Sequence, residues 1–283
     1  MPFSELDLVA NRLRVRALTW GSRGGPVVVL VHGFPDTPHG WDVIGQALAE
    51  SGAFVVAPFL RGYAPSEAGA KDTTTRDLGE DVIGLVAALG VQRVHLVGHD
   101  WGAESAYAAV ALAPEAFHTL TTIAIPHRAT LTPTPQLAWA IRHFVTLSLP
   151  GAEARFAKHD FAMMEELITR WSPTWKFSAD ELAPIKACFR EPGTVHAALG
   201  YYRAAALRTP DFMAKPVTVP TLNIAGTDDP GVRPAAFEST RRHYLAGFEV
   251  LTVPGGHFCH RESPEPVIAA LRRQLRASLQ TTP

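Results

Sequence analysis

Six short segments rich in apolar and β-branched residues constrain the fold more than any other feature of this chain. The first run, residues 27–31, is Val-Val-Val-Leu-Val and ends at His32 and Gly33. A run without polar residues is typical of a strand that is buried on both faces of a parallel sheet. The other predicted strands are residues 54–57, 94–97, 119–125, 221–225 and 248–253.

Segments with apolar residues at helical spacing separate most of these runs. They cover roughly residues 41–50, 76–89, 103–112, 235–244 and 264–275. Strand and helix in alternation predict an α/β fold, in which a mostly parallel sheet carries helices on both faces.

The alternation stops after residue 125 and resumes at Pro220. Between about residues 130 and 212 the chain has helix-like pieces, many aromatic residues and seven prolines, but no convincing strand. We therefore expect an α/β core made of residues 1–128 and 215–283. Residues 129–214 are predicted to form a helical lid over the carboxyl edge of the sheet.

Composition excludes several classes of function. The formal net charge of -1 gives no electrostatic case for nucleic acid or an anionic membrane as partner. The two cysteines, Cys188 and Cys259, are too few for a disulfide framework or a Cys-rich zinc site. No stretch approaches the ~20 apolar residues that span a bilayer, and residues 1–9 lack a signal pattern. We expect a cytoplasmic protein; the oligomeric state is not predicted.

The most informative motif is Gly98-His99-Asp100-Trp101-Gly102, between a predicted strand and a predicted helix. Its pattern is Gly-x-nucleophile-x-Gly, in which small residues permit a sharp turn. Such a turn raises the central side chain above the sheet, where the next amide and the helix N-terminus face developing negative charge.

The central residue is an aspartate, Asp100, rather than serine. A carboxylate needs no deprotonation to attack a carbon centre, and the product is an ester of the enzyme. Water must then cleave that ester, which requires a base and an oxyanion site. The alternative interpretation is that Asp100 only caps the following helix.

Three further loops follow predicted strands and carry suitable groups. His32-Gly33-Phe34-Pro35 can aim the amide of Phe34 at an oxyanion, together with the amide of Trp101. Asp228 and Asp229 follow one strand, and His257 follows the last. The order nucleophile, acid, histidine is that of an α/β-hydrolase, and all these loops lie where open α/β sheets place their sites.

With these motifs and Tyr201-Tyr202-Arg203, the chain resembles an α/β-hydrolase-fold epoxide hydrolase over essentially its whole length. The resemblance implies an α/β-hydrolase fold with Asp100 as nucleophile, His257 as base and Asp229 as the acid that orients it. Asp228 stays the alternative acid. It also implies a small apolar epoxide and water as substrates, a diol as product, and no metal or organic cofactor.

Epoxide hydrolases usually place two lid tyrosines against the epoxide oxygen. Tyr202 matches the second of these. The family's spacing before Pro150-Gly151-Ala152-Glu153 puts His143 at the position of the first, which resembles a minority bacterial branch. Histidine can donate a hydrogen bond from a ring nitrogen. The alternative is that His143 is an ordinary lid residue.

Two rival functions stay open. A haloalkane dehalogenase has the same fold and the same Asp-His-Asp triad, but it holds a halide in place of an epoxide oxygen. A non-catalytic binding protein on the same scaffold would usually lose a catalytic group, whereas all three positions are filled here.

A second departure from the family is Phe59, where an acid often stands. His257 and His260 have no third ligand beside them in the sequence, so no metal site is predicted.

Overall fold

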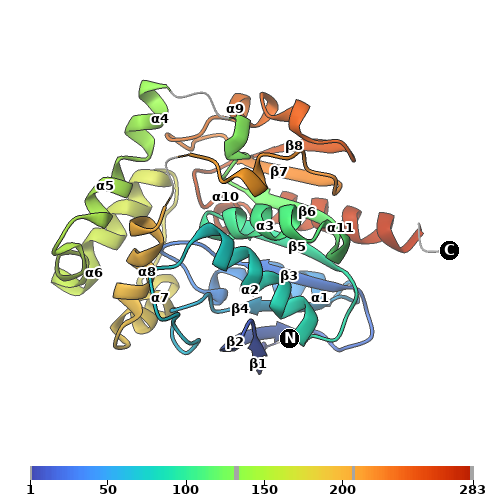
Figure 1. Ribbon diagram of the computed structural model, residues 1–283, viewed down its shortest axis with the longest axis horizontal. Helices are drawn as coiled ribbons and strands as arrows, with labels where there is room; N and C mark the ends of the chain where they lie inside the picture. Colours follow the sequence, from blue (N-terminus) through green and yellow to red (C-terminus); the bar gives the residue numbers. More distant parts are fainter. Residues whose placement is uncertain (1, 131–133, 206–207, 281–283) are drawn as a thin grey trace.

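One eight-stranded sheet organises the protein, as seen in a computed structural model that describes residues 2–130, 134–205 and 208–280. The strands lie in the order β1-β2-β4-β3-β5-β6-β7-β8 (Figure 1). Their bounds are β1 Ser4–Ala10, β2 Leu13–Trp20, β3 Val27–Val31, β4 Phe54–Pro58, β5 Val94–His99, β6 Phe117–Ile123, β7 Thr221–Gly226 and β8 Phe248–Val253.

All six predicted strands are present, and the pairs from β4 to β8 are parallel. β1 and β2 were not predicted. They form an antiparallel hairpin at the edge of the sheet, and β2 pairs with β4. Chain order reverses between β3 and β5, because β4 lies on one side of β3 and β5 on the other. Such a switch point is where open α/β sheets form a binding crevice at their carboxyl ends.

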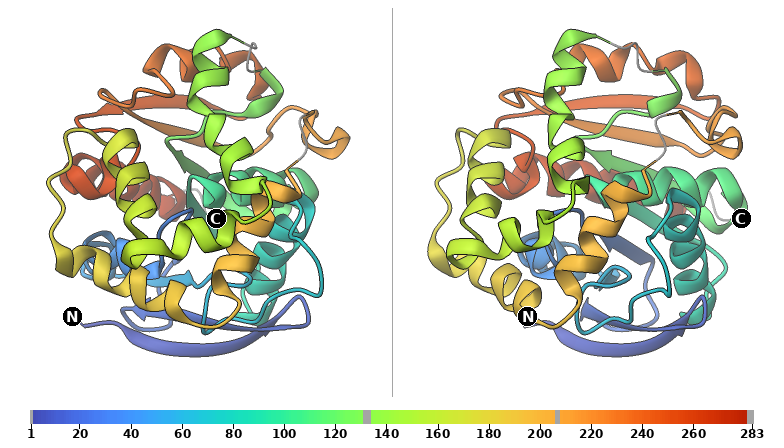
Figure 2. Two further views of the ribbon diagram at one scale, coloured as in Figure 1. Left: turned by 90° about the vertical axis from the view of Figure 1, so that its left-hand side faces the viewer. Right: turned by 60° about the vertical axis from the view of Figure 1, so that its left-hand side comes forward.

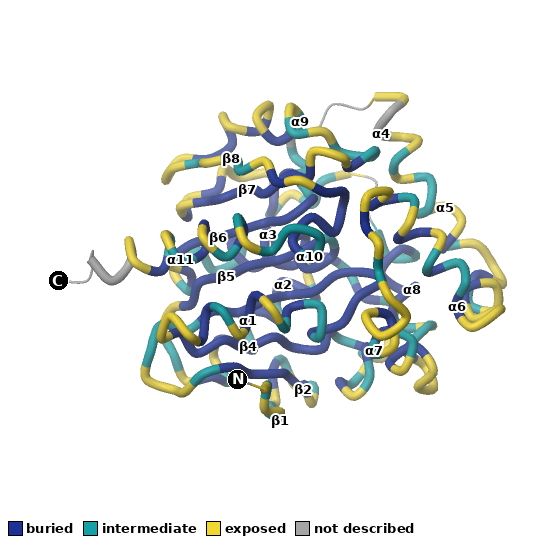
Figure 3. Tube along the Cα trace, turned by 180° about the vertical axis from the view of Figure 1, so that it is seen from behind, coloured by how far each residue is buried: buried dark blue, intermediate teal, exposed yellow. Residues whose placement is uncertain are grey.

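Helices cover both faces of the sheet, as the alternation predicted. α2 (Thr75–Ala88) packs against α3 (Trp101–Leu112), and α1 (Asp42–Ala49) packs against α11 (Pro264–Gln280). Figure 1 shows the first pair in front of the sheet, and Figure 3 shows the second pair from behind. The tube in Figure 3 is dark blue along the central strands, because their residues are buried on both faces.

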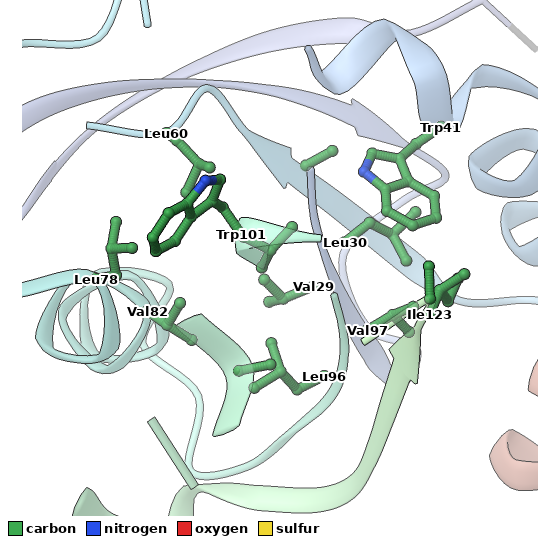
Figure 4. Close-up of a cluster of buried hydrophobic side chains, with 14 of the residues drawn as sticks. Val29, Leu30, Trp41, Leu60, Leu78, Val82, Leu96, Val97, Trp101 and Ile123 are labelled. Carbon is green, nitrogen blue, oxygen red and sulfur yellow. The ribbon is translucent and has the colours of Figure 1, made fainter. Parts of the chain in front are cut away.

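The core follows from the alternation of side chains along each strand. Val29 and Leu96 point toward α2, whereas Leu30 and Val97 point toward Trp41 on the opposite face (Figure 4). All four strand residues are essentially inaccessible to solvent. The central strands are thus held rigidly from both faces, which fixes the positions of the loops that follow them.

Between β6 and β7 the described residues form helices and 3-10 turns, with no strand among them. The helices are α4 Pro135–Ala140, α5 Arg142–Ser148, α6 Ala152–Trp171, α7 Ala179–Arg190 and α8 Thr194–Arg203. They group at one end of the sheet, and Figure 2 shows this end turned toward the viewer. Residues 1, 131–133, 206–207 and 281–283 of the predicted core and lid lie outside the described residues.

Two of the contacts that attach these helices to the core come from α8. The Tyr201 hydroxyl donates to the carbonyl of Arg61 at 2.7 Å, and Arg203 forms an ion pair with Asp72 at 2.7 Å. No helix in the described part of the chain is long and apolar enough to cross a membrane.

The predicted helix over residues 235–244 is wrong in its second half. α9 ends at Glu238, and a 3-10 turn follows at Arg241–His243. Ser239 and Thr240 donate their hydroxyls to backbone carbonyls three residues earlier, at 2.7 Å each. Such bonds compete with helical ones and favour the end of a helix.

Candidate active site

The Gly-x-Asp-x-Gly motif forms a strained turn between β5 and α3. Asp100 has φ of +52°, a left-handed conformation that non-glycine residues rarely adopt. A Cβ on Gly102 would lie 2.1 Å from the carbonyl oxygen of Val31, so only glycine fits against β3. Strain of this kind persists where the surrounding structure over-determines it, often at functional sites.

The Asp100 side chain is aimed at the switch point and makes no capping hydrogen bond to α3. Its Oδ1 accepts a hydrogen bond from the Phe34 amide at 2.8 Å, and its Oδ2 lies 3.4 Å from Nε2 of His257. The side chain is 13% exposed. The carboxylate therefore faces an amide and an imidazole, rather than the helix that it precedes.

His257 lies in the loop after β8 and is held on three sides. Its amide donates to the carbonyl of Trp171 at 2.9 Å, and its own carbonyl accepts from Nε2 of His99 at 3.0 Å. Its Nδ1 lies 3.2 Å from Oδ2 of Asp229. The imidazole is thereby placed between two carboxylates, with one ring nitrogen toward each.

Charge decides the protonation state of His257. Burial by itself lowers the pKa of this imidazole, but the carboxylates of Asp100 and Asp229 outweigh burial and raise the pKa to about 9. At neutral pH the ring is an imidazolium. It can act as a base only after it loses this proton, and removal of one of the two negative charges favours that loss.

The structure separates the two adjacent acids that the sequence left open. Asp229 is buried, and besides His257 it accepts hydrogen bonds from the amides of Gly231 at 2.7 Å and Val232 at 3.1 Å. Asp228 is exposed and bonds to the hydroxyl of Thr227. Asp229 is therefore the acid that contacts the histidine.

The loop after β3 positions the Phe34 amide. Nε2 of His32 accepts a hydrogen bond from the amide of Leu60 at 3.1 Å, and burial lowers the pKa of His32 to about 4, so that the ring stays neutral. This bond ties the Phe34 loop to the loop after β4. The Trp101 amide, also predicted for the oxyanion site, is in the first turn of α3, where helical N–H groups have no partner within the helix.

Tyr202 packs directly over this centre from α8. Its ring lies 5.3 Å from that of Trp101 and 5.2 Å from that of Phe34, both edge to face. The hydroxyl is buried, and no group among the described residues accepts a hydrogen bond from it. Burial, with the charge of Asp100 added, raises the pKa of Tyr202 well above its ordinary value, so the phenol keeps its proton.

His143 lies beside Tyr202, with ring centroids 5.7 Å apart. Burial lowers the pKa of His143 to about 4, although the charge of Asp100 opposes this. A neutral ring has a single N–H, and Nδ1 lies 3.0 Å from the carbonyl of Ala140. Because a carbonyl only accepts, Nδ1 holds that N–H and Nε2 carries a lone pair.

Two aromatic residues that line the site, Trp171 and Phe144, were not assigned from the sequence. Trp171, at the end of α6, binds the His257 amide through its carbonyl, and its ring contacts the rings of His143 and His257 at 4.8 and 5.5 Å. Phe144 packs against Trp101 and Tyr202 at 5.8 and 4.9 Å. Their aromatic character alone did not distinguish a site lining from an ordinary core.

The protein matches a family model described as the alpha/beta hydrolase fold over residues 26–264. An AB hydrolase superfamily protein of Bacillus subtilis is 29% identical over 263 residues, which covers 90% of this chain and 91% of the relative. An epoxide hydrolase of Caballeronia sordidicola is 29% identical over 96% of this chain and 93% of its own. The solved structure of an epoxide hydrolase from Vigna radiata superimposes with a TM-score of 0.84 at 24% identity, covering 97% of this chain and 98% of that one.

Proposed function

Because the chain belongs to the alpha/beta hydrolase fold family, we propose that it is an epoxide hydrolase, which opens an epoxide to a vicinal diol through an ester on Asp100. The observation that carries the proposal is the placement of the Asp100 carboxylate. It lies between the Phe34 amide at 2.8 Å and the His257 imidazole at 3.4 Å, beneath a buried tyrosine. The relative from Caballeronia sordidicola, which is named an epoxide hydrolase, supports the proposed activity.

In the first step Asp100 Oδ2 attacks an epoxide carbon, since Oδ1 is held by the Phe34 amide. A carbon–oxygen bond forms to the enzyme as the ring carbon–oxygen bond breaks. The ring oxygen takes its proton from the Tyr202 hydroxyl. As a general acid, this hydroxyl must lie within hydrogen-bond distance of the ring oxygen. No group among the described residues accepts a hydrogen bond from that buried hydroxyl, so its proton is available.

Alkylation also switches the role of His257. The ester has no charge, so one of the two carboxylates that raise the His257 pKa to about 9 is lost. Burial then favours the neutral ring. The proton that His257 releases balances the proton that Tyr202 has donated, and neutral His257 becomes the base.

In the second step His257 takes a proton from water, and the hydroxide attacks the carbonyl carbon of the ester. The oxyanion forms on Oδ1, where the Phe34 amide already donates a hydrogen bond. We assign the Trp101 amide as the second donor. The tetrahedral intermediate collapses by breaking the ester bond, and the departing alkoxide takes the proton from His257 to leave as diol. The new carboxyl group of Asp100 then gives its proton to His257, which restores the carboxylate and the imidazolium.

The lid supplies the apolar surroundings of this chemistry. We assign residues 129–214 to the lid, since Tyr202, His143, Phe144 and Trp171 all come from this segment. The ring contacts around Tyr202 favour a small apolar epoxide. In the described conformation His143 is an acceptor at Nε2, so it joins Tyr202 as a donor only if it gives up the bond to Ala140.

The test is a panel of epoxides and matched haloalkanes, assayed with the wild type and with Asp100→Asn. We expect diol formation by the wild type and none by the variant. Halide release without diol formation would make the protein a haloalkane dehalogenase. Turnover of neither substrate class, with measurable ligand binding, would favour the binding-protein alternative.

A further inference from the structure

A second polar cluster lies behind the triad and has no part in the proposed reaction. Asp36 comes from the loop after β3, His99 from the end of β5, and His260 from α10 (Cys259–Glu262). They are 2%, 0% and 1% exposed. One ligand atom from each lies within 4.8 Å of the others, and such clusters of buried polar groups are costly unless they are satisfied.

The hydrogen bonds of the two imidazoles leave lone pairs inside this cluster. His99 uses Nε2–H to donate to the His257 carbonyl at 3.0 Å, so its Nδ1 carries the lone pair. Neither Nδ1 of His99 nor either ring nitrogen of His260 has a hydrogen-bond partner in the described part of the chain. A histidine whose second nitrogen donates to a backbone carbonyl is the usual arrangement of a metal ligand.

Asp36 completes the set with a negative charge. The Thr37 amide and Arg261 both donate to its Oδ1, at 2.8 and 3.3 Å, which leaves Oδ2 as the oxygen available to a metal. Two imidazoles and one carboxylate suit a borderline divalent ion such as Zn²⁺, rather than Mg²⁺ or Ca²⁺, which take mainly oxygen ligands.

The spacing fits such an ion after a small contraction. Three atoms no more than 4.8 Å apart can all be reached from a point about 2.8 Å away from each. Zinc ligands lie about 2.0–2.2 Å from the metal, so each ligand atom moves inward by about 0.7 Å. We propose that Asp36, His99 and His260 form a binding site for one divalent transition ion of the Zn²⁺ class.

The imidazolium of His257 lies beside this cluster, with its ring 4.9 Å from that of His99, and Arg261 faces the cluster through its ion pair with Asp36. Its charge opposes a second cation at close range. The proposal therefore makes an unusual prediction: removing this positive charge strengthens metal binding. A purely structural role of the cluster gives no such effect.

His99 connects this cluster to the triad. His99 donates to the His257 carbonyl, and the two rings lie 4.9 Å apart. A metal ion on His99 thus acts on the group that serves as base. This consequence for turnover rests on the proposed function, whereas metal binding does not.

The experiment measures binding without any activity assay. Because the three ligands are buried, the full chain is expressed in medium with added Zn²⁺, dialysed, and analysed for metal by mass spectrometry. We expect about one zinc per chain in the wild type and at least a tenfold loss of affinity in His260→Gln. Co²⁺ supplied in the same way should give visible absorption bands that shift or disappear in this variant.

Asp36→Asn is a second ligand variant, in case one of them fails to fold. Arg261→Gln should bind the metal tenfold or more tightly. The matched control is His243→Gln, since His243 is buried with an unpartnered Nε2 but lies outside the cluster. Wild type without zinc or Co²⁺ bands, equal metal content in wild type and folded ligand variants, or weaker binding by Arg261→Gln would each overturn the proposal.

Discussion

Replacement of Asp100 by Asn reproduces the loss of charge that ester formation causes, and so isolates the proposed switch in His257. The pKa of His257 is raised from 6.5 to about 9, a gain of about 2.5 units that Asp100 and Asp229 supply against burial. Because they also offset the burial penalty, their joint contribution exceeds this gain. If Asp100 supplies half, Asp100→Asn lowers the pKa by at least about 1.2 units, or about 1.7 kcal/mol.

The assay is a pH titration by NMR of protein labelled with ¹⁵N in its histidine rings. His257→Gln identifies the signal of His257 among the 12 histidines. Asp228→Asn is the matched control, because this exposed neighbour of Asp229 has no contact with the ring and should leave its pKa unchanged. An unchanged His257 pKa in Asp100→Asn would refute the charge argument.

Three further perturbations test other parts of the account. Tyr202→Phe should slow ester formation about 100-fold or more without loss of stability, since no group among the described residues accepts a hydrogen bond from the buried hydroxyl. In rapid-quench experiments Tyr202→Phe should slow ester formation more than His143→Phe does. The reverse order would identify His143 as the main proton donor. Gly102→Ala should destabilise the protein by a few kcal/mol in urea unfolding, because its Cβ would meet the Val31 carbonyl at 2.1 Å; unaltered stability and activity would show that the turn is not tightly packed. The raised pKa of His257 contributes stability that is complete below pH 6.5 and lost as the pH rises to about 9, so the unfolding free energy should fall by up to about 3 kcal/mol over that range, and His257→Gln should lack this component.

Most of the sheet was predictable because its central strands are buried on both faces and are therefore rich in apolar and β-branched residues. The edge hairpin β1–β2 was missed, although its sequence alternates Leu6 and Leu8 with charged residues. Its turn is at Asn11 and Arg12, both with positive φ. Period-two alternation around an Asn-containing turn was a usable signal for a half-exposed hairpin.

The ends of the strands identified the nucleophile loop, the acid loop and the histidine loop without any side-chain geometry. Adjacent residues such as Asp228 and Asp229 cannot be distinguished in this way, because which one turns inward depends on the backbone of the loop. The bond between His143 and Ala140 is likewise a product of how α4 meets α5. It determines which nitrogen carries the proton, and residue identity alone could not.

The cluster of Asp36, His99 and His260 could not be predicted from the sequence at all. Metal-ligand patterns are recognised in sequences by short spacings, and only the fold brings these three distant residues together. Considering His260 with His257 alone gave two ligands and no site. Asp36 follows β3 and His99 ends β5, the fourth and fifth strands of the sheet order, so their pairing brings these two residues together.

A single turnover in H₂¹⁸O tests most directly whether Asp100 forms a bond to the substrate. With enzyme in excess over epoxide, the account predicts ¹⁸O in the peptide that contains Asp100 and none in the diol. Label in the diol, with an unlabelled Asp100 peptide, would mean that water opens the epoxide directly and would contradict the account.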